Sequence, residues 1–235
     1  MTKNVVKPAK LEEFFTRLNE AFGKFLVLRG YEFLPSGYSN DIDVYVPKED
    51  LGRFFSCLTD LDGLDTSITI LMSRLGLIKC ELVLEGEVIP LDILYGFYYF
   101  GLEYQDCDQL SRKSSLHNSK LFYTPTLSDE VRISLLKELL HNSRVRRDKA
   151  IYLYDMMAVC SPELPTEYFD SDTIEVVRCA IRSENLYLPN ISKALKKRLL
   201  KYNFAKQYFG TARNIILFAA VKYLFKNSYH TKMLK

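Results

Sequence analysis

The stretch LRGYEFLPSGYSNDIDVYV, residues 28–46, places two aspartates on its second strand, DIDVYV, whose other residues have the composition of a protein core. It joins a short apolar strand to an alternating one through a loop that carries a glycine at each end. Successive side chains of a strand point to opposite faces, so Asp41 and Asp43 share a face while Ile42 and Val44 take the other. Two neighbouring carboxylates repel each other and resist desolvation unless a cation lies between them. A divalent cation that prefers oxygen ligands, Mg²⁺ or Mn²⁺, removes both costs.

A third aspartate, Asp92, lies within the apolar segment VIPLDILYG, with Leu91 and Ile93 on the opposite face of the expected strand. If this strand lies beside the one that carries Asp41 and Asp43, the three carboxylates converge. Such a set suits a pair of metal ions that hold a triphosphate, with Asp92 as general base or as a ligand of the second metal. The alternative is a salt-bridged or edge-exposed trio with a structural role.

Asp-x-Asp spacing alone has little weight, because the chain contains it three more times in polar segments typical of turns and helix starts. These pairs are Asp60/Asp62, Asp106/Asp108 and Asp170/Asp172. We predict turn-forming and capping roles for them.

The predicted elements form a mixed sheet followed by helices. The sheet part has helices at 9–22 and 47–58, strands at 24–30, 41–46 and 66–73, and a hairpin at 76–96. Beyond about residue 125 we expect only helices, at 128–144, 146–159, 171–183, 190–207 and 211–227. The sequence therefore predicts an α+β protein, with a small mixed-sheet domain over residues 1–105 and an all-α domain over residues 106–235.

Three motifs together resemble the nucleotidyltransferase superfamily of DNA polymerase β: LRG at 28–30, DID at 41–43 and PLDI at 90–93. More narrowly, residues 28–46 look like a bacterial branch of that superfamily that is often associated with polysaccharide or cell-surface gene clusters. The segment at 128–150 resembles the helix that follows the sheet in those proteins. The resemblance covers roughly residues 22–150.

This resemblance implies a nucleotidyltransferase-like sheet domain in which Asp41, Asp43 and Asp92 are catalytic and bind Mg²⁺ or Mn²⁺. It implies an NTP donor such as ATP and transfer of its NMP to a hydroxyl or phosphate acceptor. A small molecule such as a sugar is the favoured acceptor. The alternatives are a macromolecular acceptor, tRNA or protein, and a non-catalytic nucleotide-binding or scaffold module.

Nucleotide-binding residues are expected around the loop after the first strand. The superfamily usually has a Gly-Ser or Gly-Gly pair there, which holds the donor's phosphates through backbone amides and a hydroxyl. Here Tyr31 follows Gly30, a departure that favours the non-catalytic alternative. We expect other polar or small residues to contribute to phosphate binding, and the predicted set is Arg29, Gly30, Ser36, Gly37, Ser39 and Lys120.

Charge is divided unequally along the 235 residues. The net charge is +3, but the chain from residue 185 onward holds eleven Lys and Arg and no Asp or Glu, which leaves −8 on the first 184 residues. The basic tail interleaves Lys and Arg with Phe and Tyr. Three interpretations stay open: a nucleic-acid surface, an anionic membrane surface, or a helix pair packed on the rest of the helical domain.

The remaining composition narrows the class of protein. The five cysteines are scattered without a CxxC pair, which predicts free thiols and excludes a familiar zinc site. No stretch approaches the roughly 18 apolar residues of a membrane span, and the N-terminus lacks the apolar segment of a signal peptide. We expect a cytoplasmic protein.

Overall fold

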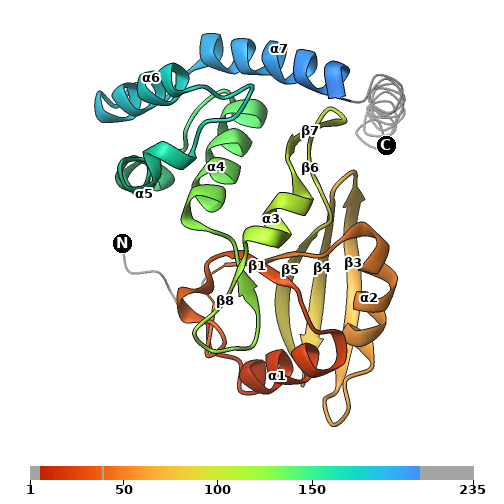
Figure 1. Cartoon of the computed structure of the whole chain (residues 1–235). Coiled ribbons are helices and arrows are strands. Elements are labelled where there is room, and N and C mark those ends of the chain that lie inside the picture. The colour runs from red at the N-terminus through yellow and green to blue at the C-terminus, as the bar shows by residue number, and fades with distance from the viewer. Residues whose placement is uncertain (1–5, 39, 207–235) are drawn as a thin grey trace, which may run out of the picture. The chain divides into compact units, whose positions relative to one another are not determined.

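The computed structural model describes residues 6–38 and 40–206, and the chain divides into two compact units (Figure 1). The sheet unit holds the described residues up to Phe97 together with Asp106–Thr126. The helical unit holds Tyr98–Gln105 and the described residues from Leu127 onward. The sequence analysis expected the boundary between the two domains after residue 105, whereas this division assigns 98–105 to the helical unit and 106–126 to the sheet unit.

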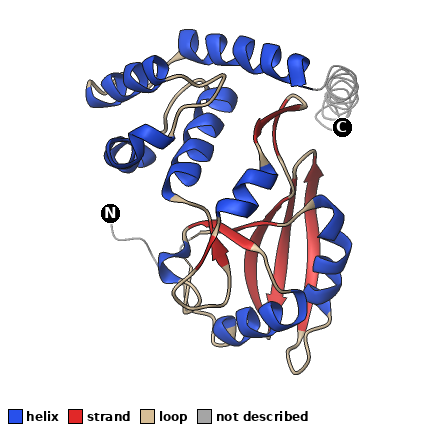
Figure 2. Ribbon diagram, in the orientation of Figure 1, coloured by secondary structure: helices blue, strands red, loops and turns tan. Residues whose placement is uncertain are grey.

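The sheet unit combines short helices with strands, as Figure 2 shows by colour. Its helices are α1 (Leu11–Phe22), α2 (Leu51–Thr59) and α3 (Cys107–Lys113), with 3-10 turns η1 (Tyr31–Phe33) and η2 (Lys48–Asp50). Its strands are β1 (Leu26–Arg29), β2 (Ile42–Tyr45), β3 (Thr66–Arg74), β4 (Leu77–Leu84), β5 (Glu87–Leu94), β8 (Ser115–Leu116) and β9 (Tyr123–Thr124).

These seven strands form one mixed sheet in the order β3-β4-β5-β2-β1-β9-β8. The central pair β5–β2 is parallel, and so is β1–β9, while the other neighbours are antiparallel. The α+β class and the mixed sheet that the sequence predicted are therefore confirmed. The strand that carries Asp92 lies directly beside the strand that carries Asp43.

One face of this sheet forms the core with α1 and α2. The buried face of α1 consists of Leu11, Phe14, Phe15, Leu18 and Phe22, at the spacing of one side of a helix. Phe54 and Leu58 from α2 join them, and alternate residues of the central strands complete the cluster. Because these residues take one side of the sheet, the residues between them are directed to the other side.

The helical unit consists mainly of four helices. They are α4 (Leu127–Lys137), α5 (Arg147–Cys160), α6 (Ser171–Arg182) and α7 (Pro189–Lys206), with a π-helical turn η3 (Glu138–Asn142) after α4 and a 3-10 turn η4 (Ser161–Glu163) after α5. A two-stranded sheet of β6 (Phe97–Tyr99) and β7 (Leu102–Gln105), which the sequence did not predict, lies mostly in this unit. The helix predicted at 211–227 lies outside the described residues.

Three predictions of local structure can be compared directly. Asp106 and Asp170 are N-caps whose carboxylates accept a backbone N–H in the first turns of α3 and α6, as predicted. All five cysteines are free thiols. Within the described ranges, no helix has both the length and the apolar character needed to cross a membrane.

Candidate active site

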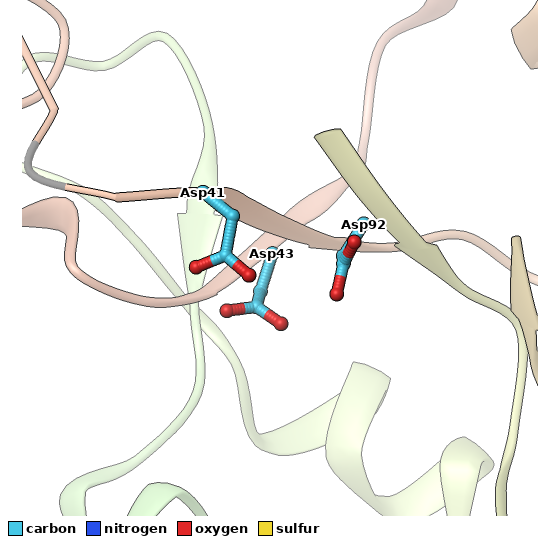
Figure 3. Close-up of side chains that lie close together, drawn as sticks. All are labelled: Asp41, Asp43 and Asp92. Carbon is cyan, nitrogen blue, oxygen red and sulfur yellow. The ribbon is translucent and has the colours of Figure 1, made fainter. Parts of the chain in front are cut away.

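Two adjacent strands bring Asp43 and Asp92 side by side. The parallel pairing of β2 with β5 places these two residues directly opposite each other, and Asp41 lies immediately before β2. One carboxylate oxygen from each of the three aspartates lies within 4.8 Å of the others. Figure 3 shows all three side chains directed to the same side of the sheet. The three carboxylates therefore converge, as the sequence predicted for strands lying side by side.

The face that carries these carboxylates is the one opposite the helix-covered core. Ile42 and Val44 flank Asp43 on β2 and belong to the core cluster, so Asp43 itself is directed to the other side. The same alternation on β5 directs Asp92 away from the core. Asp43 is only 3% exposed and Asp92 only 6% exposed. Carboxylates this deeply buried need cations or donors nearby, since desolvation of a lone charge is costly.

A row of four charged residues crosses the sheet at this level. Antiparallel pairing places Arg29 of β1 opposite Asp43, and Lys79 of β4 opposite Asp92. The order across β1, β2, β5 and β4 is therefore positive, negative, negative, positive. Each central carboxylate has a cation on its outer side and the other carboxylate on its inner side.

The two ion pairs differ in geometry. Arg29 donates two hydrogen bonds to Asp43, from Nε to Oδ2 at 2.5 Å and from Nη2 to Oδ1 at 3.1 Å. Lys79 donates from Nζ to one oxygen of Asp92 at 2.7 Å. The Arg29 side chain is 27% exposed and the Lys79 side chain 41% exposed. The arginine pair is thus the more enclosed and the more rigid of the two.

The pKa of two groups reports the field of these carboxylates. Burial acts to lower the pKa of Arg29, but attraction and hydrogen bonding to Asp43, with smaller contributions from Asp41 and Asp92, raise it overall. Burial, together with the charge of Asp92, raises the pKa of Cys80 to about 12. Cys80 belongs to the helix-covered core cluster, on the face opposite the three carboxylates, and its thiol donates to the Leu91 carbonyl.

The donor set fits an oxygen-preferring divalent ion. Two ligands of one Mg²⁺ lie at most about 4.2 Å apart, because each Mg–O distance is about 2.1 Å. One carboxylate oxygen each of Asp41, Asp43 and Asp92 lies within 4.8 Å of the others, and small side-chain rotations would bring these oxygens within about 4.2 Å. Three carboxylates with no available thiolate suit Mg²⁺ or Mn²⁺ better than a soft metal.

The residues predicted to bind the nucleotide are placed around the end of β1. Gly30 follows Arg29 with a φ of +69°, a left-handed conformation that favours glycine, and η1 starts directly after it. Ser36 is exposed and Gly37 buried in the loop before β2, while Ser39 lies outside the described residues. Their role in phosphate binding stays a prediction.

Lys120, also predicted to bind the nucleotide, lies in the turn between β8 and β9. Its side chain is exposed, its φ is +62°, and its backbone N–H donates to the His117 carbonyl. His117 in the same turn stacks on Phe122 and contacts the Tyr31 ring edge to face. Packing between His117 and Tyr31 therefore links this turn to the segment after Gly30, and a phosphate-binding role for Lys120 stays a prediction.

No family model and no curated protein matches the chain. Among solved structures, it is similar to JHP933 from Helicobacter pylori, at 13% identity and a TM-score of 0.40, over 96% of this chain and 95% of that one. It is also similar to ANT(2″)-Ia in complex with adenylyl-2″-tobramycin, at 14% identity and a TM-score of 0.39, over 72% of this chain and 95% of that one. Both TM-scores are too low to carry an argument.

Lys79 is the residue of this cluster that the sequence analysis missed. It is the lone charge in the apolar segment GLIKC, and the turn at Glu85-Gly86 fixes which residues of the hairpin face each other. Pairing Leu84 with Glu87 and counting outward brings Lys79 opposite Asp92. The signal was therefore present in the sequence, in the register of the hairpin.

Proposed function

We propose that this chain is a metal-dependent nucleotidyltransferase that moves an NMP from an NTP to a hydroxyl or phosphate acceptor, with a small molecule such as a sugar favoured. The observation that supports it is the group of three carboxylates, two of them buried, that two paired strands gather on one face of the sheet. Carboxylates grouped in this way can hold divalent ions, and phosphoryl transfer requires their positive charge beside the reacting phosphate. The resemblance of residues 28–46 to the polymerase β superfamily supports the same proposal.

In this proposal Asp41, Asp43 and Asp92 hold Mg²⁺ or Mn²⁺. The ion supplies neutralisation of charge on the triphosphate and on the departing pyrophosphate. The acceptor oxygen bonds to the α-phosphorus, the bond from that phosphorus to the pyrophosphate oxygen breaks, and Asp92 accepts the proton of the acceptor hydroxyl. Arg29 keeps Asp43 in place through its two hydrogen bonds.

The direct test measures labelled NMP transfer from each NTP, with Mg²⁺, to a panel of sugars and sugar phosphates. We expect Asp41→Ala and Asp92→Asn to reduce transfer by about 100-fold or more. Asp62→Asn is the matched control, because it changes an exposed member of another Asp-x-Asp pair in the same unit. Equal transfer by the wild type and by Asp41→Ala would exclude this chemistry.

A macromolecular acceptor is the second candidate, and the exposed cations of α7 favour it. Lys193, Lys197 and Lys201 recur every fourth residue and are exposed, while Leu195 and Leu199 are buried. A stripe of cations along a helix suits the phosphates of tRNA. Labelled NMP that appears on tRNA or on a protein, and on none of the small acceptors, would select this candidate.

A non-catalytic nucleotide-binding module is the third candidate, and the Gly30-Tyr31 sequence favours it. A bulky residue replaces the second small residue of the superfamily's phosphate-binding pair. Nucleotide binding that persists unchanged in Asp43→Asn, with no product formed from any acceptor, would support this candidate over both enzymes.

A further inference from the structure

The two cations of the charged row differ in how easily each can leave its carboxylate. The Arg29 guanidinium bonds both oxygens of Asp43 and is mostly enclosed. The Lys79 ammonium bonds one oxygen of Asp92, and its side chain is 41% exposed at the end of a flexible four-carbon stem. Rotation about that stem can carry the ammonium into water, whereas departure of Arg29 would break two hydrogen bonds at once.

The balance of charge gives this difference a consequence. Asp43 and Asp92 are both buried and lie opposite each other on neighbouring strands, so each needs a positive partner in the absence of a metal. Arg29 and Lys79 supply one positive charge each. A divalent ion beside Asp92 adds two further positive charges, and repulsion then acts between the ion and the nearest ammonium.

We propose that Lys79 is the resident counter-cation of Asp92 and is exchanged for the divalent ion when that ion binds. The inference rests on the proposed metal site and concerns how tightly that site holds its ion. Lys79 stabilises the metal-free protein and weakens metal binding, while Arg29 stays on Asp43 in both states. Lys79 is therefore a positioning residue for Asp92, and it sets the metal affinity of the site.

The test measures Mn²⁺ binding to the full chain by electron paramagnetic resonance of the free ion, without nucleotide. Lys79→Met should bind Mn²⁺ about tenfold more tightly than the wild type, since a unit charge about 6 Å from a divalent ion in water changes the affinity by about that factor. Lys79→Gln should tighten binding similarly, because it removes the charge and keeps a donor for Asp92. Agreement of the two variants would assign the effect to charge.

Lys10→Met is the matched control. Lys10 bonds Glu13 at 2.7 Å, and its side chain is 47% exposed. This variant therefore removes an exposed ion pair of the same length that does not involve any of the three aspartates. Mn²⁺ affinity should not change in Lys10→Met. Thermal unfolding provides a second readout: Lys79→Met should melt lower than the wild type without metal, and Mn²⁺ should raise its melting temperature by more.

The outcomes separate this inference from the proposed function. Unchanged or weaker Mn²⁺ binding by both Lys79 variants, with wild-type binding that is lost in Asp43→Asn, would overturn the exchange and leave the metal site standing. Wild-type protein that binds no Mn²⁺, or binds it equally well in Asp43→Asn, would overturn the metal site and the exchange together.

Discussion

At the scale of single residues, the carboxylate of Asp43 and the guanidinium of Arg29 depend on each other. Both of the oxygens that Asp43 offers are bonded by Arg29, and the aspartate is almost fully buried. Removal of one partner of a buried pair leaves the other charge without compensation, which is costlier than loss of an exposed pair. Lys79 can reach water, so loss of Asp92 leaves its cationic partner less buried than loss of Asp43 leaves Arg29.

Asp43→Ala should therefore destabilise the sheet unit by about 2 kcal/mol. This value is below that of a fully buried pair, because the Arg29 side chain is 27% exposed and can regain some water. Asp92→Ala should cost less than half as much, since Lys79 can turn outward. Urea unfolding of the metal-free proteins measures both changes, and a larger loss in Asp92→Ala would contradict the assignment of roles.

Gly30 provides a second test at this scale. Its φ of +69° lies in the left-handed region, while no atom beyond its two chain neighbours lies within 4 Å of an added Cβ. Gly30→Ala should therefore destabilise the protein by about 1 kcal/mol through backbone strain alone. Gly52→Ala is the control: it lies in α2 with equal space and no positive φ, so alanine there should stabilise by about 0.5–1 kcal/mol. Urea unfolding distinguishes the two signs.

At the scale of elements, the start of α6 concentrates several interactions on one carboxylate. Asp170 caps the helix, accepting from the Thr173 backbone N–H at 2.9 Å and from its hydroxyl at 2.5 Å, and it pairs with Arg198 of α7 at 2.6 Å. Hydrogen bonding to Thr173, and then to Arg198, lowers the pKa of Asp170 to about 2. The ionised cap therefore joins α6 to α7.

Asp170→Ala should destabilise the helical unit by about 1 kcal/mol at neutral pH. Because the folded-state pKa of about 2 lies below the ordinary value of 3.8, the contribution of the carboxylate is complete above about pH 4 and is lost as the pH falls through about 2. Unfolding free energies of wild type and variant should converge over that interval. Asp172→Ala, exposed in the same first turn, is the control and should show a smaller loss.

Long elements and the short strands β1 and β2, which have a clear apolar pattern, were predictable, whereas the shortest elements were not. α1, α6 and α7 have apolar positions that recur at helical spacing over three or more turns, and their predicted ranges agree with the structure within a few residues. The strands β8 and β9 have two residues each, too few for any periodicity. The predicted helix at 128–144 changes to a π-helical turn at Glu138, a buried carboxylate paired with Arg146 and Lys149, and local sequence does not encode such partners.

The candidate site was likewise predictable only in part. That Asp41 and Asp43 share a face followed from alternation within one strand. The adjacency of Asp92 required that β5 lie beside β2, which only the packing of the whole sheet decides. Lys79, the partner of Asp92, follows from the register of the local β4–β5 hairpin, whereas Arg29 reaches Asp43 through the pairing of β1 with β2 across a longer loop. Residue types and the hairpin partner were thus readable from sequence, whereas the contact between β2 and β5 was not.

At the scale of the whole molecule, the separation of charge along the chain distinguishes the candidate acceptors. The first 184 residues carry a net charge of −8, and the remainder is basic without any acidic residue. Of the eleven basic residues there, those of α7 are within the described residues, and Lys193, Lys197 and Lys201 are exposed. A nucleic-acid acceptor would use this end of the chain.

Reversal of charge at Lys193, Lys197 and Lys201, each to Glu, tests that acceptor. If tRNA binds here, the variant should bind more weakly. The negative slope of log affinity against log salt should also become shallower by about 2, since three phosphate contacts are removed. Filter binding at several salt concentrations measures both quantities.

A second triple variant controls for overall charge. Lys10, Lys24 and Lys48, each changed to Glu, make the same change in net charge on exposed positions of the sheet unit. Its tRNA affinity should fall much less than that of the α7 variant. Equal losses in the two variants, or no tRNA binding by the wild type at low salt, would argue for a small acceptor.

The parallel contact between β2 and β5 has a consequence for biogenesis. α2, β3 and β4 lie between these strands in the chain, and the entropy of closing so long a loop slows folding. A ribosome-bound chain that has emerged only as far as β4 lacks Asp92, the third carboxylate of the cluster. Acquisition of Mn²⁺ during synthesis would therefore time the moment at which the nascent polypeptide completes its long-range architecture.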